Sequence, residues 1–114
     1  MKQSDTMHAL TTSDDLEAAL RAPAAVLLKH STRCPISAAA LEEVTQLRAR
    51  NPDVPVYLVD VHEQRDLSDE VAERLGVAHN SPQAFVLARG VPLWQASHYS
   101  IKARKLAEEL AAVG

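Results

Sequence analysis

The chain has 114 residues, 46% of them hydrophobic, and a formal net charge of -3 at pH 7, and these totals predict one domain, residues 1–114, with a single core. The basic residues are scattered, which argues against a nucleic-acid partner. The chain starts with polar residues and has no apolar run near the roughly 18 residues of a membrane span, so we expect no membrane association and a cytoplasmic location.

The first predicted elements are a helix, a strand and a second helix. An acidic segment that begins at Ser13 precedes apolar residues at helical spacing, which favours a capped helix ending near Pro23. The apolar run over residues 24–30 is typical of a strand covered on both faces. Residues 35–50 then carry apolar side chains at three- and four-residue intervals, so we expect an amphipathic helix that stops at Asn51.

The middle of the chain predicts a second strand and a third helix. Residues 54–61 (VPVYLVDV) are rich in β-branched side chains and favour a buried strand. The next helix is expected to open at Ser68, with two acidic residues in its first turn. It is expected to close at Gly76, because glycine best tolerates the left-handed conformation that ends many helices.

The last third of the chain predicts a hairpin and a closing helix. Residues 83–88 and 91–96 read as strands joined by a tight turn at Arg89 and Gly90, and Ser100 is expected to cap the final helix. Alternating helices and strands followed by a hairpin favour an α/β fold. We therefore expect a mixed central sheet of about four strands, with helices on both faces.

The chemical focus of the sequence is Cys34, the only cysteine. One cysteine cannot form an intramolecular disulfide, so any redox reaction must pass through a mixed disulfide with another molecule or a second copy of the chain. Cys34 lies where a strand passes into a helix, with Pro35 in the first helical position. The free N–H groups and the dipole of that helix favour a thiolate, the nucleophilic form. This placement favours a reactive thiol over a buried structural cysteine.

Several residues near Cys34 are candidates for tuning the thiol or binding its ligand. We expect Arg33 and His30 to add positive charge, and the Ser37 hydroxyl to donate a hydrogen bond to the sulfur. Lys29 is a candidate for binding a ligand carboxylate, although a lysine that extends its ammonium to solvent at the strand edge is equally consistent. The histidines lack the spacing of a zinc site, so no metal site is predicted. Among them, only His30 and His79 are expected to approach Cys34.

The Cys-x-x-Ser motif that starts at Cys34, together with a later Ser-Pro pair before a strand and a hairpin, resembles the thioredoxin superfamily. Residues 29–40 (KHSTRCPISAAA) are most similar to the monothiol bacilliredoxins, as are the SPQ segment around Pro82 and residues 96–101 (ASHYSI). The resemblance extends along the whole chain. It implies a thioredoxin-like fold, closed by the β-hairpin and the C-terminal helix.

The same resemblance implies roles for individual residues. It implies that a cis peptide bond precedes Pro82, that Pro82 faces Cys34, and that the backbone of Ser81 pairs with the backbone of a thiol-bearing ligand. Arg33 departs from the family pattern, in which a small or hydroxyl residue is expected. This departure leaves the chemistry of Cys34 intact and bears on the preference for ligands.

The function implied by the resemblance is thiol–disulfide exchange in redox homeostasis. Cys34 removes bacillithiol, a low-molecular-weight thiol, from mixed disulfides of client proteins, with bacillithiol as redox co-substrate and no tightly bound cofactor. Ser37 occupies the position of a resolving cysteine, so a second small thiol must regenerate Cys34. Two alternatives remain open, namely a redox sensor whose Cys34 is modified without turnover and an iron–sulfur cluster carrier that uses Cys34 as a ligand.

Overall fold

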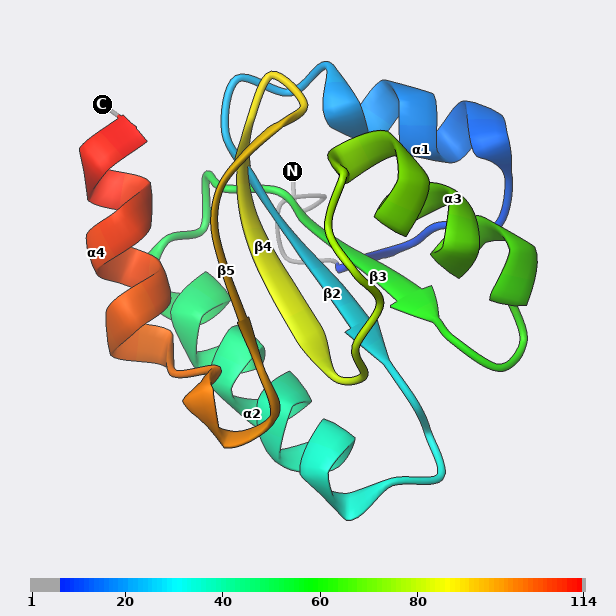
Figure 1. Ribbon diagram of the computed structural model, residues 1–114. Helices are drawn as coiled ribbons and strands as arrows, with labels where there is room; N and C mark the ends of the chain where they lie inside the picture. Colours follow the sequence, from blue (N-terminus) through cyan, green and yellow to red (C-terminus); the bar gives the residue numbers. More distant parts are fainter. Residues whose placement is uncertain (1–6, 114) are drawn as a thin grey trace.

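The computed structural model describes residues 7–113 of the chain. A five-stranded mixed sheet with the order β1-β3-β2-β4-β5 forms its centre (Figure 1). Strands β1, β3 and β2 are parallel, whereas β4 runs antiparallel to β2 and β5 runs antiparallel to β4. The strands are β1 (His8–Ala9), β2 (Ala25–His30), β3 (Val56–Asp60), β4 (Gln83–Ala88) and β5 (Val91–Ser97). The predicted α/β class with a mixed sheet is confirmed.

Helices cover both faces of the sheet, as Figure 1 shows. One face packs against α1 and α3, and the other packs against α2 and α4, with one apolar cluster in each layer. Strands β2 and β4 lie in the middle of the sheet and are buried on both faces, which explains their nearly continuous apolar sequences. The helices are α1 (Ser13–Leu20), α2 (Pro35–Arg50), α3 (Arg65–Leu75) and α4 (Ala103–Val113), with a short 3-10 helix η2 (His98–Ser100) before α4.

Two turn predictions are confirmed by backbone angles. Gly76 ends α3 in the left-handed region, with φ +68°. Arg89 and Gly90, which connect β4 to β5, both have positive φ values of 48° and 82°. Such a turn matches the twist of the two hairpin strands. None of the helices between residues 7 and 113 is long and apolar enough to cross a membrane.

The predicted start of α3 at Ser68 is wrong, because the helix begins at Arg65. The N–H of Ser68 donates a 2.8 Å hydrogen bond to the carbonyl of Gln64, as in a helix interior. The acidic residue of the first turn is Asp66. It lies one turn before Asp69 and Glu70, the acidic residues that suggested a cap at Ser68. The Gln64 side chain makes no capping bond, so the true start carries no local signature.

The predicted cap of the final helix at Ser100 is also wrong, because Ser100 belongs to η2 and α4 begins at Ala103. The backbone N–H of Ala103 donates a 2.8 Å hydrogen bond to the carboxylate of Glu43 on α2. A side chain 60 residues away in the sequence thus satisfies this N–H. The sheet also has one strand more than the four expected, since β1 is only two exposed residues long and leaves no pattern in the sequence.

Candidate functional site

The register of the sheet brings the predicted site residues to one end of the molecule. Lys29 near the end of β2 pairs with Gln83 at the start of β4, so Pro82 lies beside the end of β2. Residues 31–33 then lead from β2 to Cys34, which is the N-cap of α2. The carboxyl end of β3 lies at this same end of the sheet, next to β2 (Figure 1).

Cys34 is a half-buried free thiol at the N-terminus of α2, as predicted. It has extended backbone angles (φ -121°, ψ 124°), and its carbonyl accepts the N–H of Ala38 at 3.1 Å, the first bond of the helix. Pro35 occupies the first helical position. Within residues 7–113, no side chain, that of Cys34 included, caps the N–H groups that follow it. These N–H groups and the helix dipole therefore remain free to stabilise an anion at the N-cap.

Two serines hold the loop that leads to Cys34. The buried Ser37 hydroxyl accepts the N–H of Ser31 at 3.0 Å, and the Ser31 hydroxyl accepts the N–H of Arg33 at 3.2 Å. The expected hydrogen bond from Ser37 to the sulfur of Cys34 is not formed within residues 7–113, because the hydroxyl lies against the loop backbone instead. Ser37 thus fixes the position of the loop, while the Arg33 side chain is exposed.

The peptide bond between Ser81 and Pro82 is cis, as the family resemblance implied. The carbonyl of Pro82 accepts the N–H of His98 at 3.0 Å, which ties this loop to the start of η2. The backbone of Ser81 forms no hydrogen bond with the described part of the chain and is free to pair with a ligand.

Gln83 is a site residue that sequence reasoning did not single out. Its side chain is fully buried. It donates hydrogen bonds to the Ala78 carbonyl (3.2 Å) and the Gln95 side chain (3.0 Å), and accepts one from the N–H of Asn80 (3.3 Å). Gln83 therefore anchors the loop before Pro82. The signal available in the sequence was a polar residue that opens a predicted strand directly after the Ser-Pro pair.

Lys29 does not extend its ammonium to solvent, so that reading of the sequence is wrong. The residue is 0% exposed, and its Nζ has no hydrogen-bond partner within residues 7–113. Burial lowers the pKa of Lys29 to about 8, although the carboxylate of Asp69 acts in the opposite direction. Burial and the positive charge of Lys29 both lower the pKa of His79, so the two side chains interact electrostatically.

His30 does not supply the positive charge that was expected near Cys34. It is half-buried, and burial lowers its pKa below the usual 6.5, although Asp60, its pairing partner on β3, opposes the shift. His30 is therefore predominantly neutral at pH 7. Because side chains alternate along β2, His30 and Lys29 also point to opposite faces of the sheet.

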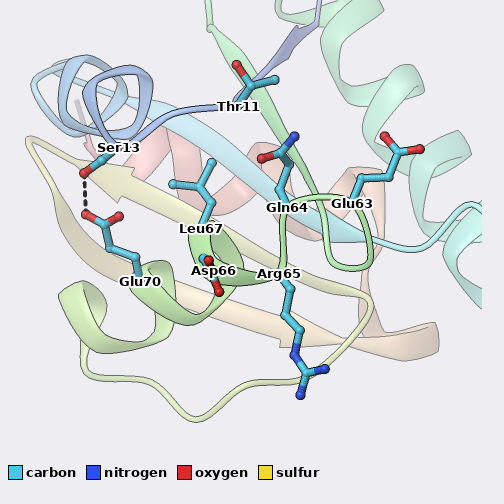
Figure 2. A pocket seen from close by; sticks show the side chains of 8 residues that line it. All are labelled: Thr11, Ser13, Glu63, Gln64, Arg65, Asp66, Leu67 and Glu70. Carbon is cyan, nitrogen blue, oxygen red and sulfur yellow. Dashed lines mark hydrogen bonds between the residues drawn. The ribbon is translucent and has the colours of Figure 1, made fainter.

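A pocket at the start of α3 has no contribution from the thiol, and Figure 2 shows the side chains that line it. It has a volume of about 420 Å³ and lies at the start of α3, with three carboxylates in its wall, those of Glu63, Asp66 and Glu70. The Ser13 hydroxyl donates a 2.8 Å hydrogen bond to Glu70, and Arg65 extends away from the other side chains. Cys34 is not part of its lining, so this pocket is not the candidate site.

Comparisons with known proteins agree with this geometry. Residues 8–106 match the sequence model of the family described as monothiol bacilliredoxin BrxC. A solved structure described as a proposed oxidoreductase with a thioredoxin fold is 34% identical over 90% of this chain and 91% of its own, with a TM-score of 0.85. A thioredoxin from Trypanosoma brucei brucei is 10% identical over 99% of this chain and 96% of its own, with a TM-score of 0.80. A Fasciola hepatica thioredoxin is 19% identical over 95% and 100%, with a TM-score of 0.75.

The two thioredoxins show the fold alone, because their sequence identity to this chain is too low to indicate a function. The family match and the first of these structures go further and support thiol–disulfide redox chemistry with thiol partners. The half-buried thiol at the start of α2 is the group in the chain that can carry out this chemistry.

Proposed function

Because this chain belongs to the monothiol bacilliredoxin family, we propose that it removes bacillithiol, or a similar low-molecular-weight thiol, from mixed disulfides of client proteins. The observation that carries the proposal is the position of the only thiol in the sequence, at the N-terminus of α2 and at the same end of the sheet as Pro82. We propose that the reaction takes place in the cytoplasm, where protein thiols are kept reduced.

The proposed reaction consists of two exchanges. The Cys34 thiolate attacks the bacillithiol sulfur of the mixed disulfide, a new disulfide forms between Cys34 and bacillithiol, and the client sulfur leaves as a thiolate that takes up a proton. A second small thiol, as thiolate, then attacks the bacillithiol sulfur on Cys34. This step releases the Cys34 thiolate and forms a disulfide between two small thiols. Since Ser37 stands where a resolving cysteine would be, the second thiol must come from another molecule.

The residues around Cys34 have distinct proposed roles. The free N–H groups after Pro35 stabilise the thiolate both as attacking and as leaving group. The unpaired backbone of Ser81 binds the backbone of the thiol-bearing ligand. The exposed guanidinium of Arg33 attracts anionic groups of the client or of the small thiol. Ser37 acts through the loop that it holds in place.

The experiment uses a client protein that carries bacillithiol on a single cysteine and follows its intact mass. The wild-type protein is expected to remove bacillithiol, and Cys34→Ser is expected to be inactive because it lacks the nucleophile. Ala39→Ser, at a half-buried residue within α2, is a matched control that should retain activity. Removal of bacillithiol by Cys34→Ser at the wild-type rate would refute the proposal. The same assay with glutathione and cysteine on the client tests the preference for the small thiol.

A further inference from the structure

Two buried polar atoms on the α3 side of the sheet have no hydrogen-bond partner within residues 7–113. They are Nζ of Lys29 and Oγ of Ser68, and these two residues are 0% and 1% exposed. Buried polar groups are nearly always hydrogen-bonded, and a buried ammonium without a counter-ion is the most costly exception. Both atoms can donate a hydrogen bond, so together they call for an acceptor that the described chain does not provide.

Lys29 and Ser68 belong to the same layer of the structure. Side chains alternate along β2, and Leu27, two residues before Lys29, packs in the apolar cluster that α1 and α3 cover. Ser68 follows Leu67, a member of that same cluster on α3. The electrostatic effect of Asp69 on Lys29 agrees with this arrangement.

A pocket opens to solvent at Ser68, and two of its lining residues, Asp69 and His79, interact electrostatically with Lys29. It has a volume of about 320 Å³, and Ser68 itself forms part of its wall. The charges of its lining are those of Arg65 and Asp69, and the buried Lys29 ammonium adds a second positive charge, so the site favours an anion over a cation. The lining residues are Val61, His62, Arg65, Ser68, Asp69 and His79.

We propose that Lys29 and Ser68 form a carboxylate-binding subsite, reached through this pocket. The Lys29 ammonium donates to one carboxylate oxygen and the Ser68 hydroxyl to the other, which satisfies both buried donors at once. The ligand is the carboxylate of the small thiol that exchanges with Cys34, and this part of the inference rests on the proposed function. Bacillithiol, glutathione and cysteine all carry carboxylates, so the shared chemistry is the carboxylate group.

The subsite lies at the same end of the sheet as the thiol. Lys29 is five residues before Cys34 on the same strand and loop, and His79 lies in the loop that leads to Pro82. Because His79 also lines the pocket, this loop connects the pocket with the segment before Pro82. The subsite would therefore bind the part of the small thiol farthest from its sulfur.

The test measures binding of reduced bacillithiol to the Cys34→Ser protein by calorimetry at pH 7, which separates affinity from exchange. Adding Lys29→Met is expected to weaken binding about tenfold or more, and adding Ser68→Ala about threefold, as for a charged and a neutral hydrogen bond. Lys102→Met, which removes an exposed lysine, is the matched control and should leave the dissociation constant unchanged. Equal affinity of the Lys29→Met, Ser68→Ala and control proteins overturns the subsite. Lys29→Met replaces an unpaired buried charge by an apolar chain of similar length, so it is expected to fold.

A second titration with free L-malate distinguishes the source of the carboxylate. If malate also binds and loses affinity in Lys29→Met, the subsite takes a free carboxylate; if only bacillithiol does so, it takes the carboxylate of the thiol. Either result supports the subsite, and the absence of Lys29-dependent binding of both ligands refutes it.

The client assay distinguishes failure of the subsite from failure of the proposed function. If Lys29→Met has unchanged client kinetics and unchanged affinity for bacillithiol, the proposed function stands and the subsite is refuted. If the wild-type protein is inactive on the client but binds malate in a Lys29-dependent way, the subsite stands and the proposed function is refuted.

Discussion

Lys29 and Gln83 are paired across β2 and β4, and both side chains are completely buried on the same face of the sheet. Gln83 makes three hydrogen bonds that hold the loop before Pro82. Lys29 makes none with the described residues. Of two neighbouring buried polar residues, one is satisfied by the fold and the other is not. The first acts in positioning the loop, and the second is the place where a ligand completes the structure.

Replacement of Lys29 is expected to stabilise the protein. Lys29→Met removes an unpaired buried ammonium and retains most of the apolar volume, so we expect the free energy of unfolding at pH 7 to rise by about 1–3 kcal/mol. Urea denaturation measures this change. The exposed-lysine control Lys102→Met should stay within about 0.5 kcal/mol of wild type. A loss of stability in Lys29→Met would show that the ammonium has a favourable partner in the folded chain.

The pH dependence of stability should carry the signature of Lys29. Its pKa is about 8 in the folded protein and 10.5 when unperturbed. Below pH 8 the lysine is charged in both states, and the cost of burial is present in full. Between pH 8 and 10.5 the unfolded chain binds more protons, so stability rises with pH by roughly 3 kcal/mol.

The difference in stability between wild type and Lys29→Met isolates this effect from other titrating groups. Asp69, His62, Arg65 and His79 line the adjacent pocket and are present in both proteins. We expect the advantage of Lys29→Met at pH 7 to shrink as the pH approaches 10, in urea titrations at a series of pH values. An advantage that is constant with pH would contradict the lowered pKa of Lys29.

Gln83→Leu should release the loop before Pro82. The substitution keeps the buried volume but removes three hydrogen bonds, with an expected cost of about 1–2 kcal/mol. Hydrogen exchange at the N–H of Asn80 is the specific readout, because that N–H donates to Gln83. Gln95→Leu, which removes only one of the three bonds, should leave the exchange rate of Asn80 unchanged. Equal rates in wild type and Gln83→Leu would mean that Gln83 does not anchor the loop.

Glu43→Ala should weaken the attachment of α4. The substitution removes the acceptor for the N–H of Ala103, and a lost cap of this kind costs about 1 kcal/mol. Denaturation in urea gives the change in stability. Glu42→Ala, at the exposed neighbouring residue, should cost less than about 0.5 kcal/mol. If the two variants lose the same stability, the cap from α2 contributes nothing.

Local signals explain which parts of the site could be predicted. Cys34 and Pro35 are adjacent at a strand-to-helix boundary, and the Ser-Pro pair at Pro82 stands directly before a strand, so their places in the fold follow from short stretches of sequence. Contacts between residues far apart in the sequence could not be predicted from such local signals. The cap from Glu43 to Ala103 joins residues far apart in the chain. The burial of Lys29 depends on which strands and helices surround β2.

Ser37 shows the same limit at short range. The spacing from Cys34 predicts that Ser37 stands in place of a resolving cysteine, but spacing does not fix the direction of a hydroxyl. In the structure the Ser37 oxygen accepts the buried N–H of Ser31. A buried backbone N–H requires an acceptor, and this requirement explains why the side chain serves the loop.

The most direct test of the central claim is to map the bacillithiol after a single turnover. Wild-type protein is mixed with an equimolar amount of bacillithiolated client, without any other thiol, and both proteins are digested and analysed by mass spectrometry. We expect bacillithiol to move to the peptide containing Cys34 and the client cysteine to be recovered as a free thiol. Bacillithiol that stays on the client, with Cys34 unmodified, would contradict it.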